Sequence, residues 1–456
     1  MIFSSLLFIF WFMPVFFILY YLVPMRAKNF VLLIGSMIFY GWGEPKYLLL
    51  LVISILVNYF SGLLIHHFRG RADKLILICA LVFDIGMLFF FKYINFFIEN
   101  INAFSGSSIA KVNITLPLGI SFYTFQIMSY VIDLYRGKVD VESSIVNLGT
   151  YLCMFPQLIA GPIVVYSDVS AALKNRRITA GAIEEGIEIF VLGLGSKVLI
   201  ANNAGELWKE LENIGYDNIS VPLAWLGMLA FTLQIYFDFN GYSMMAIGLG
   251  KMLGFEFPKN FNLPYISTSI TEYWRRWHMT LSGWFRDYLY IPLGGNRKGR
   301  VRVIINLFIV WFVTGFWHGA DWNFILWGLY FFVLIMVERA GFGRFLEKHR
   351  IFAHIYSLIA IGFGWLLFAI TDLKQLGVYI SRLFTGGISG SEIYYIRNYF
   401  FIIIVGCILS SGSGNKFYEK IRNKRAVVAV LLSCILILST AFLADASYNP
   451  FLYFRF

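Results

Sequence analysis

Long apolar runs separated by short polar breaks extend over the whole sequence. Most contain about 20 apolar residues, the length that a helix needs to cross the hydrocarbon core of a bilayer. The apolar residues are continuous and do not alternate with polar ones, which favours helices over the strands of an outer-membrane barrel. The pattern predicts an all-α, polytopic membrane protein with candidate spans at 3–24, 30–43, 46–65, 75–97, 115–133, 145–165, 182–204, 221–250, 303–320, 322–338, 352–371, 396–411 and 426–444.

Two of these segments do not fit a simple crossing. Segment 145–165 contains Pro156 and Pro162, and proline interrupts a helix. We predict that this segment is re-entrant, because non-helical backbone at that depth is tolerated only where protein or a water-filled cavity surrounds it. Segment 221–250 is too long for one span, and we expect a break at Phe239-Asn240-Gly241. We expect about eleven true spans, together with re-entrant and interfacial helices.

The composition excludes a chain whose main solvent is water. Of the 456 residues, 59% are hydrophobic and only 14% are charged, whereas a soluble domain is about half apolar and about a quarter charged. The net charge of +11 does not indicate a nucleic-acid surface, because the basic residues sit in short loops, as in the cytoplasmic loops of membrane proteins. Alternation with less basic loops places both termini outside; the basic loops are 66–74, 134–138, 174–177, 296–302, 339–350 and 416–425.

The four cysteines argue against a metal site or a disulfide framework. All lie inside apolar segments far apart in the sequence, with no CxxC and no Cys/His cluster: Cys79, Cys153, Cys407 and Cys434. We interpret them as small buried hydrophobic residues. The two histidines discussed below lack carboxylates at metal-ligand spacing, so we expect no metal site.

The densest polar chemistry lies in residues 258–300. Thr268 or Ser269, followed by Glu272, is typical of a capping box and predicts that a helix begins there. The following residues form one apolar face: Trp274, Trp277, Leu281, Trp284 and Phe285. Three basic residues lie largely off that face: Arg275, Arg276 and Arg286. The pattern predicts one basic, Trp-rich amphipathic helix that lies either in the membrane interface or fully embedded.

Two histidines stand out in these apolar surroundings. His278 lies beside the aromatic face, where a histidine is more often a hydrogen-bonded structural residue than a catalyst. His318 ends a strongly apolar span, and Gly315 and Gly319 remove side-chain bulk on both sides of it. An intramembrane ionisable group is costly and is a functional candidate by default. From the residues alone, an interfacial histidine beside Trp317 in an aromatic belt is the more frequent arrangement.

Asp238 lies inside an apolar run and has two interpretations. It either pairs with a buried lysine or arginine, or it lines a tunnel. We interpret Lys197, Glu188 and Asp133 mostly as structural pairs or helix ends. The sequence contains no GxSxG motif and no P-loop.

The residues alone leave several function classes open. A transporter or flippase fits re-entrant segments and intramembrane ionisable groups, although we find no inverted repeat. A non-enzymatic scaffold of an exopolysaccharide export complex is a second class, and an enzyme built around the central polar block is a third.

A series of motifs runs through that central block. They are Asp238-Phe239-Asn240-Gly241-Tyr242, Pro258 through Tyr265, Glu272 through His278, Trp284 through Tyr288, Ile291 through Arg297, and Phe316-Trp317-His318-Gly319. Together they resemble the membrane-bound O-acyltransferase superfamily, and its bacterial alginate O-acetylase branch in particular. The start of the chain (MIFSSLLFIFWFMPVF, FYGWGEP) and its end (YNPFLYFRF) fit that branch as well. Met244 stands where members of the branch often carry an acid, which leaves the substrate more open than the reaction.

The resemblance implies an enzyme with two functional histidines in a tunnel through the membrane. His318 is implied as the catalytic histidine and His278 as the second one. The implied donor is acetyl-CoA or a similar acyl thioester from the cytoplasm, with no bound cofactor, and the acceptor comes from outside. A histidine suits the base that takes the proton of an acceptor hydroxyl, so we assign that role to His318, with His278 orienting a substrate or stabilising charge. The expected substrate-binding residues are Arg275, Arg276, Trp277, Arg286, Asp287, Asp238 and Trp317.

The resemblance also implies a location and partners. We expect a multi-pass protein of the bacterial cytoplasmic (inner) membrane, with an extracytoplasmic C-terminus and one domain over 1–456, divided into 1–144, 145–340 and 341–456. The expected partners are an extracytoplasmic SGNH-hydrolase-like acetyltransferase, a polysaccharide synthesis complex and membrane lipids, but no nucleic acid. The C-terminal residues Tyr453-Phe454-Arg455-Phe456 are expected to contact the partner or to anchor the chain in the interface. The related teichoic acid branch leaves D-alanyl transfer as an alternative.

Overall fold

The structure is a computed structural model that describes residues 1–388, 390 and 392–445. The expected partner contact at 453–456, and the C-terminal motif that contains it, lie outside the described residues. The described part of the chain is helical and has no β-strand, as predicted. It forms two compact units. Two of the three boundaries between them fall inside helices, α10 (Ala180–Gly195) and α12 (Val221–Leu253), and the third follows Pro258.

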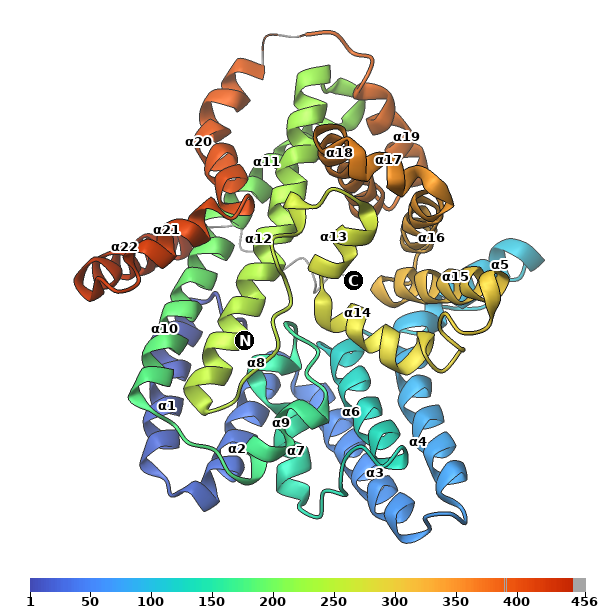
Figure 1. Cartoon of the computed structure of the whole chain (residues 1–456), viewed down its shortest axis with the longest axis vertical. Coiled ribbons are helices and arrows are strands. Elements are labelled where there is room, and N and C mark those ends of the chain that lie inside the picture. The colour runs from blue at the N-terminus through green and yellow to red at the C-terminus, as the bar shows by residue number, and fades with distance from the viewer. Residues whose placement is uncertain (389, 391, 446–456) are drawn as a thin grey trace. The chain divides into compact units, whose positions relative to one another are not determined.

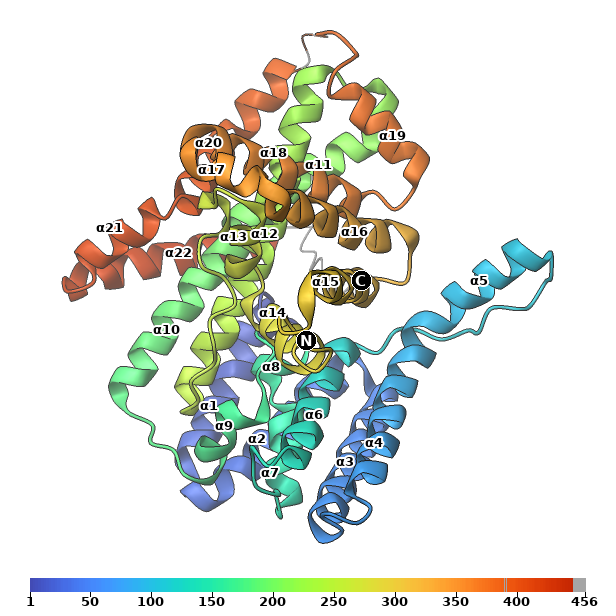
Figure 2. The ribbon, with the colours of Figure 1, turned by 45° about the vertical axis from the view of Figure 1, so that its right-hand side comes forward.

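The first unit contains residues Met1–Phe190 and Ser243–Pro258. Figure 2 shows α4 continuing into α5 as one long rod, with α3 alongside α4. The other helices of this unit pack around α2 and α6. The helices of this unit are α1 (Met13–Leu22), α2 (Met25–Gly43), α3 (Leu48–His67), α4 (Asp73–Leu88), α5 (Ile94–Ser105), α6 (Ile120–Tyr135), α7 (Ile145–Cys153), α8 (Phe155–Leu158) and α9 (Tyr166–Lys174).

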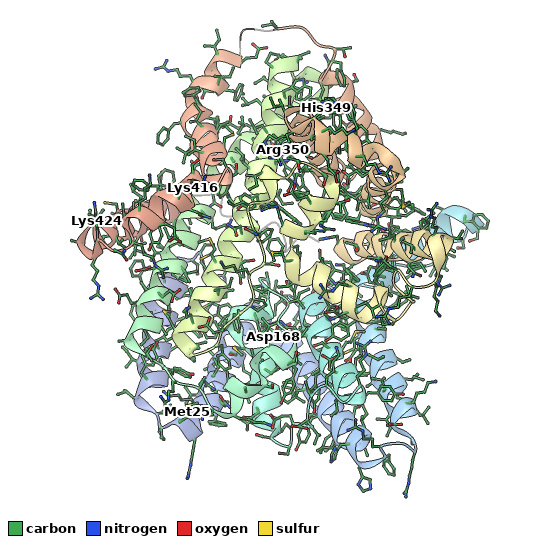
Figure 3. All side chains as sticks on the ribbon, viewed as in Figure 1. Met25, Asp168, His349, Arg350, Lys416 and Lys424 are labelled. Atoms are coloured by element: carbon green, nitrogen blue, oxygen red, sulfur yellow. The ribbon has the colours of Figure 1, made fainter. Side chains whose placement is uncertain are left out.

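The second unit contains residues Val191–Tyr242 and 259 onward. Its helices are α11 (Asn203–Ile214), α13 (Ile270–Arg276), α14 (Met279–Phe285), α15 (Gly299–His318), α16 (Trp322–Val337), α17 (Gly343–Lys348), α18 (Arg350–Ala369), α19 (Leu373–Arg382), α20 (Glu392–Ser410), α21 (Ser413–Ile421) and α22 (Arg425–Asp445). Two of the predicted basic loops contain short helices, α17 and α21. Figure 3 labels His349 and Arg350 between α17 and α18, and Lys416 and Lys424 at α21.

Eight helical stretches in the described part are long and apolar enough to cross a membrane. They are Pro45–His67, Asp73–Ser105, Val221–Leu253, Gly299–His318, Trp322–Lys348, Arg350–Ala369, Glu392–Ser410 and Arg425–Asp445, with a shorter apolar helix at Phe8–Leu22. Each overlaps a predicted span. The total of about eleven spans stays a prediction, since several apolar helices, such as α6 and α7, are shorter than a bilayer crossing requires.

The predicted interruption in 145–165 is confirmed. Helix α7 ends at Cys153, Pro156 lies in the first turn of the short α8, and residues 159–165 are not helical. Residues 151–164 are buried throughout. Protein therefore surrounds this irregular backbone, as its position in an apolar segment requires.

The expected break at Phe239-Asn240-Gly241 is wrong. Helix α12 runs without interruption from Val221 to Leu253 over 33 residues. Gly241 serves packing here: a Cβ atom on it would lie 2.7 Å from the carbonyl oxygen of Gly193 on α10. The glycine lets two helices approach closely and does not end either of them.

Candidate active site

The polar segment 258–285 contains two short helices and not the one amphipathic helix that the sequence predicts (Figure 1). The predicted start is right: Ser269 Oγ accepts the Glu272 N–H at 3.0 Å, and the Glu272 carboxylate accepts the Thr268 N–H at 2.9 Å. The helix then ends at Arg276 because His278 has left-handed backbone angles, φ 43° and ψ 54°. The predicted apolar face is nevertheless buried: Trp274, Trp277, Leu281, Trp284 and Phe285.

Left-handed backbone is concentrated in this segment. Within the described residues, Leu263 and His278 are the two non-glycine positions with positive φ. Such a conformation costs about 1–2 kcal/mol for an L-residue and persists only where the surroundings impose it. Strained residues of this kind cluster at functional sites, which singles out the segment independently of any motif.

Asn260 holds the imidazole of His278 in one orientation. The distance from His278 Nδ1 to Asn260 Oδ1 is 2.9 Å, and the Thr280 hydroxyl donates to the same oxygen at 2.8 Å. Because that oxygen accepts, His278 Nδ1 carries the proton and Nε2 keeps its lone pair. The side chain is fully buried, and burial lowers the pKa of His278 to about 3. His278 is therefore a neutral imidazole at physiological pH.

His318 lies at the C-terminal end of α15 and is 3% exposed. Its ring meets the rings of Trp327 on α16 and Phe368 on α18 edge-on, with centroids 4.9 and 5.4 Å away. The prediction that Gly315 and Gly319 make room here is confirmed. A Cβ atom on Gly315 would lie 2.3 Å from the Phe324 carbonyl oxygen. One on Gly319 would lie 2.1 Å from the Phe324 ring.

Trp317 brings the two predicted histidines into one cluster. Its ring centroid lies 5.0 Å from that of His318 and 6.2 Å from that of His278. The ring of Phe239 on α12 also contacts the ring of His278, with the two centroids 4.7 Å apart. Residues of three different motifs thus meet in a buried, aromatic environment, where electrostatic interactions act with little screening.

The predicted arginines differ in how they are held. Arg276 forms an ion pair with Glu272 at 2.9 Å and donates to the Asn262 carbonyl oxygen. Arg286 pairs with Asp287 through two hydrogen bonds of 2.8 and 3.0 Å. Arg275 is exposed and makes no hydrogen bond or ion pair within the described residues. Among the three, its guanidinium is the one left for an external anion.

The remaining predicted residues have structural contacts. Trp277 is buried between Phe261 and Trp365, with centroids 4.9 and 4.8 Å away. Asp238 forms an ion pair with Lys197 at 2.8 Å, and both side chains are almost fully buried. This is the paired arrangement, one of the two interpretations of Asp238 and the one favoured for Lys197. A role of Asp238 toward a substrate stays a prediction.

Two residues with evident roles were not predicted. Asn260 orients His278, and Glu338 accepts the N–H groups of Ile270 and Thr271, at 2.6 and 2.9 Å, at the start of α13. The carboxylate of Glu338 suits the N-terminus of a helix, but it comes from 68 residues along the chain, and no local signal announces it. Asn260 lies in the motif Pro258 through Tyr265. Its signal in the sequence is that it is a polar residue among aromatic ones.

The described residues contain no group of three His, Cys, Asp or Glu side chains arranged to hold a metal ion. The two imidazoles in their aromatic surroundings offer hydrogen bonding and proton transfer.

Comparisons with known proteins identify the family of this chain. The model of the membrane-bound O-acyltransferase family matches residues 139–381. The chain is 40% identical over 394 residues to the probable alginate O-acetylase AlgI of Pseudomonas aeruginosa, covering 85% of this chain and 75% of that one. It is 34% identical to the peptidoglycan O-acetyltransferase of Helicobacter pylori, covering 100% of this chain and 98% of the relative.

A more distant branch matches in part. The teichoic acid D-alanyltransferase of Bacillus subtilis is 31% identical over 235 residues, which cover 49% of this chain and 59% of the relative. The family match contains the two histidines, Trp317 and the predicted arginines. The chain belongs to the membrane-bound O-acyltransferase family, as a multi-pass membrane O-acyltransferase of the alginate O-acetylase type.

Proposed function

We propose that the protein takes an acetyl group from acetyl-CoA in the cytoplasm and transfers it toward an extracytoplasmic polysaccharide. The names of two relatives, an alginate O-acetylase and a peptidoglycan O-acetyltransferase, support a polysaccharide as the final acceptor. The observation that carries the proposal is the buried cluster of His318 and His278 about Trp317.

In the proposed reaction, His318 is the general base. It takes the proton of the acceptor hydroxyl as the oxygen attacks the thioester carbonyl. The carbon–oxygen bond forms, the carbon–sulfur bond breaks, and the CoA thiolate leaves and takes up the proton. A thioester is a good acyl donor, so the protein's task is to place the hydroxyl and remove its proton.

The state of His278 favours an orienting role over charge stabilisation. A neutral ring with the proton on Nδ1 offers a lone pair on Nε2, which accepts a hydrogen bond from a hydroxyl. It offers neither a positive charge nor an N–H group to a developing oxyanion. We assign His278 to the positioning of the acceptor hydroxyl.

The donor phosphates are assigned to Arg275. Its exposed guanidinium forms no ion pair with the residues that the structure describes, and an arginine binds phosphate through two parallel hydrogen bonds. Arg276 and Arg286 are held by Glu272 and Asp287 and would have to exchange partners to bind donor phosphates.

The proposal includes the setting inferred from the family resemblance. The enzyme works as one domain in the bacterial inner membrane, with its C-terminus outside. An SGNH-hydrolase-like partner receives the acetyl group or completes its transfer to the polymer.

The test is acetyl transfer by membranes supplied with radiolabelled acetyl-CoA, with and without the partner. His318→Ala should lower transfer by at least about 10²-fold while membrane insertion stays normal. His66→Ala, an exposed histidine in the last turn of α3, is the matched control and should transfer normally. Equal labelling with His318→Ala would refute the assignment.

The same assay separates the alternatives. D-alanyl transfer is supported by the partial match to a teichoic acid D-alanyltransferase, and it predicts alanine and not acetate on the polymer. A transporter predicts uptake into vesicles without acyl transfer.

A further inference from the structure

Two cations, one buried and one partly buried, lie together in the first unit. Arg176 follows α9, which Figure 3 marks with Asp168, and is 7% exposed. Lys28 lies in the first turn of α2, three residues after Met25. Both belong to segments predicted to face the cytoplasm, 174–177 and the short stretch between spans 3–24 and 30–43.

Arg176 is held entirely by neutral acceptors. Its Nε–H bonds to the Tyr20 hydroxyl and the Leu253 carbonyl oxygen, both at 3.0 Å. Nη1 donates to Asn29 Oδ1 at 2.7 Å and to the Ala172 carbonyl oxygen at 3.1 Å. Nη2 makes a single contact, to the Tyr20 hydroxyl at 2.8 Å. Since Nη2 carries two hydrogens, one donor remains for a ligand.

Lys28 shares the Tyr20 side chain with Arg176. Its Nζ lies 4.5 Å from the centre of the Tyr20 ring and donates to the Tyr20 carbonyl oxygen. Burial and the nearby Arg176 both lower the pKa of Lys28. No carboxylate within the described residues forms an ion pair with either cation. Two carboxylates of this unit already have a basic partner, since Lys251 pairs with Glu185 and Glu256 at 3.0 and 3.5 Å.

An uncompensated charge of this kind is expensive to bury. Two like charges about one tyrosine ring increase that cost. The arrangement is rigid, because Arg176 connects α1, α2 and α9 with the end of α12. It is therefore a preformed site for an anion. Three further cations within two residues of Lys28 or Arg176 in the sequence are exposed: Arg26, Lys174 and Arg177.

The adjoining surface identifies the kind of anion. Apolar side chains of α1 and α2 that are close to Tyr20 or Lys28 in the sequence are exposed, among them Leu22 at 77%, Leu19 at 54% and Phe30 at 55%. A free phosphate would leave that apolar surface uncovered, whereas a phospholipid would cover it with acyl chains. We propose that Lys28 and Arg176 bind the headgroup phosphate of an anionic phospholipid, with its acyl chains along α1 and α2.

The test is lipid binding by the purified protein in detergent, followed by native mass spectrometry. Phosphatidylglycerol and phosphatidylcholine with identical acyl chains are titrated against the wild type, Lys28→Met and Lys46→Met. Among residues 1–388, 390 and 392–445, the one hydrogen-bond acceptor of Lys28 is the Tyr20 carbonyl oxygen, so its replacement leaves the hydrogen bonds of Arg176 intact. Lys46 is an exposed lysine at the opposite, predicted outer end of the same unit and serves as the control.

We expect the wild type and Lys46→Met to prefer phosphatidylglycerol, and Lys28→Met to bind it about fivefold more weakly, as expected for one removed charge. Phosphatidylcholine binding should not change. Unchanged phosphatidylglycerol binding by Lys28→Met would overturn the proposal. So would displacement of the lipid by millimolar inorganic phosphate or CoA, which would identify a site for a soluble phosphate. His318→Ala should bind lipid normally, so this result is independent of the proposed catalysis.

Discussion

The imidazole Nδ1 of His278 lies 2.9 Å from the side-chain oxygen of Asn260. This contact fixes which ring nitrogen carries the proton, and it makes Asn260 a positioning residue for the proposed reaction. Replacing Asn260 with Ala frees the ring to rotate and to change tautomer. We expect kcat to fall about tenfold or more with KM nearly unchanged.

Asn260→Asp is the matched variant for this prediction, since a carboxylate still accepts from Nδ1. It should recover part of the kcat that Asn260→Ala loses. Steady-state kinetics with acetyl-CoA measures both. A wild-type kcat in Asn260→Ala would show that the contact has no part in turnover.

The pKa of His278 predicts how stability depends on pH. The folded protein keeps His278 neutral down to about pH 3, whereas an unfolded histidine takes up its proton near pH 6.5. The folded state therefore binds fewer protons between these values, and stability rises with pH through this window. His278→Asn should lower the slope of the free energy of unfolding against pH, by up to about 1.4 kcal/mol per pH unit. Thermal unfolding in detergent between pH 4 and pH 8 tests it; an unchanged slope would contradict it.

The contact between α15 and α16 depends on glycine. A Cβ atom on Gly315 would lie 2.3 Å from the Phe324 carbonyl oxygen, and one on Gly328 would lie 2.3 Å from that of Trp311. Gly315→Ala must push the helices apart, and we expect a loss of roughly 1–3 kcal/mol in thermal unfolding experiments. It should also lower activity, because His318 follows one turn later.

Gly86→Ala is the control for that substitution. Gly86 lies inside α4, and a Cβ atom there has no neighbour within 4 Å. The melting temperature should stay the same or rise slightly, since alanine favours a helix. Equal losses in the two variants would mean that close packing at Gly315 is not the cause.

The ion pair between Lys197 and Asp238 is predicted to behave as a unit. Lys197→Met or Asp238→Leu alone leaves one buried charge without its partner, which costs roughly 3–5 kcal/mol. The double variant removes both charges and should regain most of that stability. Its activity then decides the predicted role of Asp238: a stable, inactive double variant favours substrate binding, and a stable, active one favours a purely structural pair.

The sequence predicts much of this fold because spans are signalled locally. Continuous apolar runs, the capping box at Ser269 and the prolines of 145–165 each act within a few residues. The all-helical fold, the helix start at Ser269 and the interruption of 145–165 are confirmed, whereas the number of spans and the re-entrant course of 145–165 stay predictions. The burial of Trp274, Trp277 and Trp284 was also predictable from their spacing, even though the helix that carries them is broken.

The errors and omissions involve contacts between distant parts of the chain. The sequence predicts a helix break at Gly241, but this glycine instead lets α12 approach Gly193 of α10 closely. The break at His278 depends on Asn260, 18 residues earlier, whose side chain and carbonyl oxygen both bind across it. Glu338 reaches α13 from 68 residues away. Local patterns contain no information about such partners.

The left-handed backbone at His278 and the proposed chemistry favour different residues at this position. Glycine or asparagine would adopt those angles at less cost, while the proposed chemistry requires an imidazole. A library of variants selected for thermal resistance alone should therefore drift toward glycine or asparagine at 278, and one selected for polymer acetylation should keep histidine. Disagreement between two such selections at a single position is a signature of function that needs neither a substrate nor a mechanism to be known in advance.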